Sequence, residues 1–196
     1  MTNICVIPAR GGSRRIPRKN IKLFHGKPII AYSIETAKAS GLFAEVCVST
    51  NDEEIAEVAS DYGAIVLMRP SYLAEDDIGT QEVMKYAVQQ AETIMSKSFD
   101  YACCLYATSP LIGHGDIKWA SHILTYAPCS YVVAVASNPM RDIGAFYFGS
   151  TTAFIRGVPL YNDFTRLFVV PPDRAIDINI PDDWLRAEQM YADLYK

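Results

Sequence analysis

The chain has 196 residues, half of them hydrophobic, and a formal net charge of −4, which fits one globular domain with a buried core rather than two independent domains. No run approaches the roughly 18 apolar residues of a membrane span, and Arg10 interrupts the only early hydrophobic stretch. These features speak against a membrane partner and a signal peptide, and they predict a cytoplasmic location.

Strand-like and helix-like patterns alternate from the start of the chain. In chain order, we predict a strand at 3–8, a helix at 28–40, a strand at 45–49, a helix at 51–62, a strand at 64–68, a helix at 80–95, a strand at 100–106, a helix at 116–126 and a strand at 130–136. The strands are rich in Val, Ile and Cys without polar alternation, and amphipathic helices join them. This pattern predicts an α/β fold with a mostly parallel sheet flanked by helices in three layers.

Several residues mark the helix ends. Gly41 is expected to end the first helix, and Gly63 is expected in the C′ position of the second. Thr50 with Glu53 has the spacing of a capping box at the start of that second helix.

The alternation changes after residue 137 into shorter pieces. Apolar runs occur at 145–148 and 167–170, and a closing helix is predicted at 181–194. Asp182 and Asp183 follow Pro181, so they are expected to favour the N-terminus of that helix rather than to form part of a site.

A basic, glycine-containing loop follows the first strand, with the sequence PARGGSRRIPRKN at residues 8–20. Gly11 and Gly12 allow backbone N–H groups to approach phosphate oxygens, while Arg10 and Lys19 can neutralise phosphate charge. The loop is neither a Walker loop nor a dinucleotide fingerprint. It predicts phosphate binding, with a solvated basic turn as the alternative.

The charge is distributed unevenly. Residues 1–34 carry seven Lys or Arg and no Asp or Glu, so the other 162 residues sum to −11. A local cationic loop on an acidic body favours a compact polyanion such as a nucleoside triphosphate, and it argues against an extended nucleic-acid partner.

Cysteine and histidine spacing gives no metal or disulfide signal. The five cysteines form no C-x-x-C pair, and the three histidines show no H-x-x-x-H spacing. We interpret the cysteines as reduced and mostly buried.

The segments IPARGGSRRIPRKNI and GKPIIAYSI resemble the opening of the acylneuraminate cytidylyltransferases, the CMP-sialic acid synthetase family. The resemblance continues through VSTNDEEIAEVASDYGA, RPSYLAEDDIGTQEVMKYA, CCLYATSPL, GAFYFG and DINIPDDWLRAEQM, and so covers most of the chain. The run Tyr106-Ala107-Thr108-Ser109-Pro110 is more similar to the pseudaminic acid cytidylyltransferase branch. The resemblance implies a Rossmann-like nucleotidyltransferase domain over residues 1–196.

The resemblance also implies roles for individual residues. The CTP phosphates and the departing pyrophosphate would be held by Arg10, Gly11, Gly12, Ser13 and Lys19, with Arg10 and Lys19 in the catalytic role. Cytosine and ribose would be recognised by Asn20, Arg69 and Thr80. For Arg69 and Thr80 the alternatives are a loop salt bridge and a helix N-cap.

Two further groups complete the expected site. Tyr106, Thr108 and Ser109 end a central strand at its carboxyl edge, where their hydroxyls could bind the acceptor sugar, or could serve as ordinary turn residues. Asp177 and Asn179 alternate with Ile176, Ile178 and Ile180, so on an extended segment both polar side chains share one face and the isoleucines are expected in the core. They are the candidate ligands of Mg²⁺, although family members usually carry Asp where Asn179 stands.

A second departure concerns length. Between Val135 and Gly144 the chain has only eight residues, where full-length relatives insert a few tens that form an arm for dimerisation and acceptor contacts. We therefore expect residues 137–175 to be a shortened arm or insert region, and a homodimer stays an open expectation.

The predicted activity is transfer of CMP from CTP to a nonulosonic acid of the pseudaminic or sialic type, with release of pyrophosphate and with Mg²⁺ as cofactor. Two alternatives stay open. One is a degenerate, non-catalytic nucleotide-binding relative, and the other is a cytidylyltransferase for another acidic 2-keto sugar, such as an eight-carbon one. The sequence does not select the acceptor and does not indicate a general base.

Overall fold

The computed structural model describes residues 1–137 and 139–196. Its elements follow in chain order: β1 Asn3–Pro8, β2 Leu23–Phe24, β3 Lys27–Pro28, α1 Ile29–Ser40, β4 Glu45–Thr50, α2 Glu53–Asp61, β5 Ile65–Met68, α3 Thr80–Met95, β6 Tyr101–Leu105, α4 His114–Tyr126, β7 Tyr131–Ser137, β8 Met140–Ser150, α5 Thr151–Ile155, β9 Thr165–Val169 and α6 Pro181–Leu194. Short 3-10 turns occur at Lys19–Ile21 and Ser71–Ala74.

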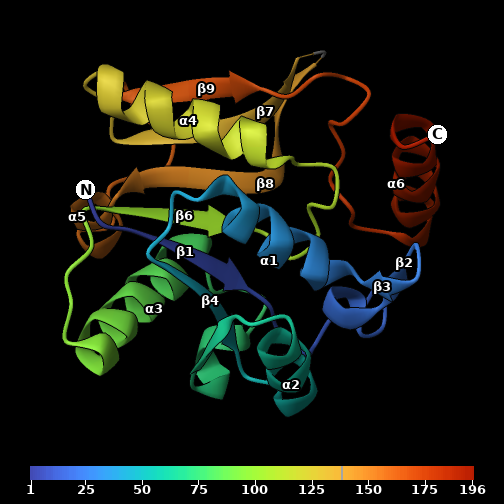
Figure 1. The fold of residues 1–196 in the computed structure, drawn as a ribbon, viewed down its shortest axis with the longest axis horizontal. Coiled ribbons are helices and arrows are strands. Elements are labelled where there is room, and N and C mark those ends of the chain that lie inside the picture. Colours follow the sequence, from blue (N-terminus) through green and yellow to red (C-terminus); the bar gives the residue numbers. More distant parts are fainter. Residues whose placement is uncertain (138) are drawn as a thin grey trace.

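Seven strands form the main sheet, in the order β5-β4-β1-β6-β8-β7-β9 (Figure 1). Every described pairing in this sheet is parallel except those of β8, which runs antiparallel to both β6 and β7. The predicted α/β class with a mostly parallel sheet is confirmed.

The two faces of the sheet bury different residues of the same strand. In β1, Cys5 and Ile7 pack with α1, α2 and α4, whereas Ile4 and Val6 pack with α3 and α5. This alternation follows from the opposite orientation of successive side chains in a strand. Because helices cover both faces, the strands are apolar throughout, and the carboxyl edge of the sheet is left for polar residues.

A third apolar cluster lies beside the main sheet, where α6 packs against the small β2–β3 hairpin (Figure 1). It contains Phe24 and Trp184, and it also includes Ile16 of the basic loop and Ile178 of the segment before α6. Two segments that are 162 positions apart in the chain are therefore brought together by apolar burial.

The start of α2 differs from the prediction. Thr50 is still the last residue of β4, so it cannot cap the helix, and the predicted capping box of Thr50 with Glu53 is wrong. Asp52 is the N-cap, and its Oδ1 accepts from the Ile55 N–H at 3.0 Å. Thr50 instead accepts from the Asp52 N–H at 3.1 Å. The predicted glycines Gly41 and Gly63 do adopt left-handed backbone, at φ 65° and 73°.

Residues 140–150 and 165–169, within the region expected to be a shortened arm, are strands of the main sheet. Ser137 of β7 pairs with Met140 of β8, so only positions 138 and 139 connect the two paired strand ends. Asn138 lies outside the described residues. The chain thus reaches β8 directly from β7.

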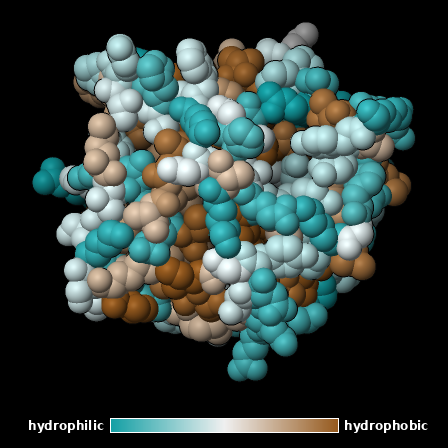
Figure 2. All heavy atoms as spheres, in the orientation of Figure 1, coloured by the Kyte–Doolittle hydropathy of each residue, from teal (hydrophilic) through white to brown (hydrophobic). Residues whose placement is uncertain are grey.

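The surface in the orientation of Figure 1 is mostly hydrophilic, with hydrophobic residues visible mainly near the centre and in the lower part (Figure 2). Among the described residues, no helix has the length and apolar character needed to cross a membrane. All five cysteines are free thiols, and four of them are buried, as predicted.

Candidate functional site

A cleft of about 530 Å³ opens at the carboxyl edge of the parallel strands. Its wall includes residues at the ends of three strands, namely Pro8 of β1, Arg69 just after β5 and Tyr106 just after β6. Thr80, the first residue of α3, also lines it. Ligands of parallel α/β sheets bind at this edge because the strand ends and the following loops converge there.

The cleft brings together most of the residues expected from the sequence. Its lining includes Arg10, Ser13, Lys19, Asn20, Arg69, Thr80, Tyr106, Thr108 and Asn179. Four expected residues, Gly11, Gly12, Ser109 and Asp177, are not part of the lining.

The cleft is strongly cationic although the chain as a whole is acidic. Its lining contains five cationic side chains, Arg10, Arg14, Arg15, Lys19 and Arg69, but only two acidic ones, Glu75 and Asp76. An excess of positive charge in a cleft attracts a small polyanion and raises its local concentration.

Arg10 is held at the front of the cleft by the segment before α3. Its guanidinium donates to the Ala74 carbonyl at 2.9 Å and pairs with Asp76 at 2.6 Å, and Arg14 pairs with the same carboxylate at 3.1 Å. Hydrogen bonding from Arg10 holds the pKa of Asp76 below its usual range. Neither Arg14 nor Asp76 was among the expected site residues. The position of Arg14 within the basic loop was a signal that could have indicated it, whereas Asp76 lies in a distant part of the chain.

The two glycines of the loop serve different purposes. A Cβ at Gly11 would overlap the carboxylate of Asp52, whose Cγ would be only 2.9 Å away. Gly12 has open space, since no heavy atom lies within 4 Å of a Cβ built there. Glycine is thus required at Gly11 by a protein carboxylate, while Gly12 is the one whose backbone is accessible to a ligand.

Lys19 connects the loop to the segment before α6. Its Nζ donates to the Ile178 carbonyl at 2.8 Å. Burial lowers the pKa of Lys19, and the nearby charges of Arg15 and Arg10 lower it further, whereas Asp177 raises it. A partly desolvated ammonium beside other cations gains much from an incoming anion.

Arg69 is a buried cation, with only 7% of its surface exposed. Neither its Nε nor its Nη1 has a hydrogen-bond partner among the described residues. Arg69 also forms no salt bridge with any of them, so the alternative of a loop salt bridge is wrong. Burial lowers the pKa of Arg69 to about 10, with a further contribution from Arg10. Unpaired buried donors are costly, so the guanidinium is poised for an acceptor group of a ligand.

Thr80 and Tyr106 form one unit in the cleft wall. Their hydroxyls hydrogen-bond each other, and the ring of Tyr106 packs edge-to-face on Tyr147 at 5.9 Å between centroids. Burial raises the pKa of Tyr106, so its phenol stays protonated and acts only as a neutral hydrogen-bonding group. Gly79, not Thr80, is the N-cap of α3, so the alternative of a capping role for Thr80 is wrong.

Ser109 lies below the cleft. Its hydroxyl donates to the Ala145 carbonyl at 3.2 Å, and the side chain is buried. Thr108, one residue earlier, lines the cleft.

Asp177 and Asn179 do lie together, on an extended stretch without regular secondary structure. The Asn179 Oδ1 accepts a hydrogen bond from Arg15 at 3.3 Å. Burial raises the pKa of Asp177, whereas the neighbouring Asn179 amide lowers it, and no ion pair reaches the Asp177 carboxylate in the described part of the chain. Of the alternating isoleucines, Ile178 is buried, but Ile180 is 42% exposed because it is the N-cap of α6, so its predicted burial is wrong.

The chain was compared with known proteins. Residues 4–142 match the model of the cytidylyltransferase family. The chain is 34% identical to the pseudaminic acid cytidylyltransferase of Campylobacter jejuni subsp. jejuni serotype O:2, over 97% of both chains, in an alignment of 225 residues. It is 30% identical to the CMP-N,N'-diacetyllegionaminic acid synthase of Legionella pneumophila, over 97% of this chain and 96% of the relative.

A solved structure shares the fold at lower identity. A CMP:2-keto-3-deoxy-manno-octonic acid synthetase complexed with CTP superposes with a TM-score of 0.78 at 16% identity, over 99% of this chain and 100% of that one. The alignment with the Campylobacter protein is longer than the 196 residues of this chain, so that relative has residues without a counterpart here.

Proposed function

This chain belongs to the cytidylyltransferase family, and from that premise we propose that it transfers a cytidylyl group from CTP to a nonulosonic acid of the pseudaminic or sialic type. Pyrophosphate is the second product. Two full-length relatives named for pseudaminic and legionaminic acid support this class of acceptor.

The basic loop, residues 9–20, binds the triphosphate in this proposal. Arg10 and Lys19 neutralise the β- and γ-phosphates and the departing pyrophosphate, Ser13 donates its hydroxyl, and Gly12 offers its backbone. The partial desolvation of Lys19 strengthens such an interaction, because charges attract more strongly where water is excluded.

Cytosine and ribose occupy the deeper part of the cleft, beside Arg69 and Thr80. The unpaired Nε and Nη1 of Arg69 match the acceptor edge of a cytosine ring, and a threonine hydroxyl can serve either as donor or as acceptor. Asn20 also lines the cleft, and its side-chain amide donates to the Arg10 carbonyl at 2.9 Å, which couples the base site to the phosphate loop.

Tyr106 and Thr108 contact the acceptor sugar in this proposal. We leave Ser109 out, because its hydroxyl is already bonded to Ala145 and lies outside the cleft lining. With only two positions between the paired ends of β7 and β8, acceptor contacts from an arm are replaced by these hydroxyls.

The residues present fit a magnesium ion that arrives with the nucleotide. Asp177 is a half-buried carboxylate with no ion pair among the described residues, and no cluster of three or more acidic, histidine or cysteine side chains that could hold a metal unaided occurs there. Mg²⁺ commonly uses one or two carboxylates and completes its shell with substrate phosphates and water. Asp177, with Asn179 beside it, would hold the ion, which when bound neutralises phosphate charge.

The proposed step is an in-line displacement. The anomeric hydroxyl oxygen of the 2-keto acid forms a bond to the α-phosphorus as the bond to the bridging oxygen of pyrophosphate breaks, and the hydroxyl proton passes to solvent. The protein contributes by orienting the two substrates and by stabilising the leaving group through Arg10 and Lys19.

One observation carries the proposal: five cationic side chains, one of them a buried and incompletely bonded arginine, surround a single cleft in an acidic chain. The experiment is a coupled pyrophosphate assay with CTP, Mg²⁺ and a panel of pseudaminic, legionaminic, sialic and eight-carbon 2-keto acids. We expect pyrophosphate release with at least one nine-carbon acid and little with ATP, GTP or UTP. Release with only the eight-carbon acid would reassign the acceptor.

A binding protein without transfer activity is the rival, and Asn179 is the observation that favours it, because an amide there supplies no negative charge, where the family resemblance leads us to expect Asp. The rival predicts that CTP raises the melting temperature while no acceptor in the panel yields pyrophosphate.

A further inference from the structure

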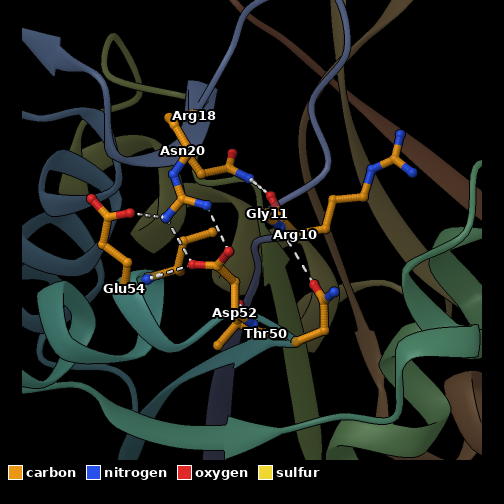
Figure 3. Close-up of polar contacts among 9 residues, drawn as sticks. Arg10, Gly11, Arg18, Asn20, Thr50, Asp52 and Glu54 are labelled. Atoms are coloured by element: carbon orange, nitrogen blue, oxygen red, sulfur yellow. Dashed lines mark hydrogen bonds and ion pairs between the residues drawn. The ribbon is translucent and has the colours of Figure 1, made fainter.

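Asp52 lies close to Gly11 and Arg18, near the two ends of the basic loop, although it is the N-cap of α2 and not part of the cleft lining. At one end, its carboxylate occupies the space that a Cβ on Gly11 would need. At the other end it accepts two hydrogen bonds from the Arg18 guanidinium, at 2.6 and 2.8 Å (Figure 3). One carboxylate thus fixes the separation between the two points where the loop leaves and rejoins the body of the protein.

Neighbouring groups hold Asp52 itself in place. Its Oδ1 caps α2 through the Ile55 N–H, and its own N–H donates to Thr50. Asn51, the preceding residue, accepts from the Gly11 N–H at 3.4 Å, and Glu54 adds a second carboxylate to Arg18 (Figure 3). The negative charge is also favoured by the helix N-terminus.

Arg18 is the one arginine of the loop that turns away from the cleft. Figure 3 shows it reaching toward Asp52 and Glu54, whereas Arg10 extends in the opposite direction. Arg18 has left-handed backbone, with φ 54°, which is unfavourable for a residue with a side chain unless contacts maintain it. The conformation leads directly into the 3-10 turn Lys19–Ile21, so it sets where Lys19 and Asn20 enter the cleft.

We propose that Arg18 and Asp52 are positioning residues: their bidentate ion pair clamps the two ends of the basic loop so that Arg10, Lys19 and Asn20 face the nucleotide together. This proposal rests on the proposed function, because the groups that the clamp positions are those proposed to bind the triphosphate. A shift of a fraction of an ångström in such groups lowers turnover much more than it lowers stability.

The partly exposed setting of the pair makes the proposal testable. The side chains of Arg18 and Asp52 retain 38% and 20% of their exposure, and ion pairs in such settings contribute little to folding stability. A merely structural role therefore predicts a small drop in melting temperature and an unchanged kcat. A positioning role predicts the same small drop with a large loss of kcat.

The test uses Arg18→Asn, because asparagine tolerates the left-handed backbone while removing the guanidinium. Lys97→Asn is the matched control: Lys97 pairs with Glu45 at 3.2 Å with comparable exposure, and neither residue lines the cleft. Two quantities are measured for each protein, namely kcat with CTP and acceptor, and hydrogen–deuterium exchange of peptides covering residues 10–20.

We expect Arg18→Asn to lower kcat by about 10- to 100-fold and to speed exchange in the loop, while Lys97→Asn changes neither. Arg18→Lys should recover only part of the loss, since an ammonium cannot form the two parallel hydrogen bonds. Unchanged loop exchange in Arg18→Asn overturns the clamp whether or not the wild type is active. Faster exchange without any wild-type turnover would keep the clamp and reject the proposed function instead.

A double-mutant cycle gives a second check. Gly11→Ala should displace the Asp52 carboxylate and mimic the loss of Arg18, but in an Asp52→Ala background the overlapping atoms are gone, and the added cost should be small. Additive effects of the two substitutions on loop exchange would contradict the clamp.

Discussion

The basic loop, residues 9–20, and the C-terminal segment, residues 175–180, contact each other beside the cleft but are built in different ways. The loop contributes several cations and is held by hydrogen bonds to Asn51 and Asp52, the two residues between β4 and α2. The C-terminal segment has no regular secondary structure and contributes one carboxylate, Asp177, that forms no ion pair with any residue the structure describes. Burial of Ile178 and the hydrogen bond from Lys19 hold the segment in place. In the proposed function, the positive charge that the protein offers to phosphate therefore comes from the loop, whereas the segment would act through a bound magnesium ion.

The largest effect should come from Lys19→Ala, because Lys19 joins the two regions. We expect turnover to fall by about 10²–10³-fold, as for loss of a preorganised group that stabilises developing charge. Pyrophosphate release under saturating CTP measures the effect, and circular dichroism checks that the fold is intact. Turnover within twofold of the wild type would remove the loop from catalysis.

Arg69→Met should separate function from stability. Replacing a buried, incompletely bonded guanidinium by an apolar side chain of similar length should raise the melting temperature of the free protein. The same change should raise KM for CTP by about 10- to 100-fold through loss of charged hydrogen bonds. A lower melting temperature with unchanged KM would show that the arginine is structural.

Asn179→Asp tests the C-terminal segment directly. A second carboxylate beside Asp177 should lower the magnesium concentration needed for half-maximal rate by roughly threefold, since carboxylate count tunes affinity for the ion. Superimposable magnesium titrations of the two proteins would exclude position 179 from the metal site.

The smallest effect is expected for Asp76→Asn. The carboxylate pairs with Arg10 and Arg14 in the free protein, so it competes with phosphate for the same cations. Because the side chain is well exposed, its loss should lower KM for CTP by only about two- to threefold. A raised KM would mean that Asp76 orients Arg10 rather than competing for it.

The two regions also differ in how well the sequence predicted them. The loop residues are close in the chain, so the motif indicated Arg10 and Lys19, and the family resemblance added Ser13 and Asn20. All four line the cleft. The reason for glycine at position 11 could not be predicted from the sequence, because it depends on the nearby Asp52 carboxylate. Asp52 is about 40 residues away in the chain and comes close to the loop only because β1 pairs with β4.

Later parts of the chain depend on pairings over longer separations. The insertion of β8 between β6 and β7, seen in the register of Cys103 with Phe148, is invisible to a local apolar pattern. Of Asp177 and Asn179, which were predicted to share a face, only Asn179 lines the cleft. The exposure of Ile180 follows from the helix start, which local alternation did not take into account.

The most direct measurement of the central claim is a crystal structure with CTP and magnesium. The account predicts triphosphate oxygens within hydrogen-bonding distance of Lys19 Nζ, the Arg10 guanidinium and the Gly12 N–H, with Arg18 still paired to Asp52. A nucleotide bound elsewhere, with residues 9–20 free of any phosphate contact, would contradict it.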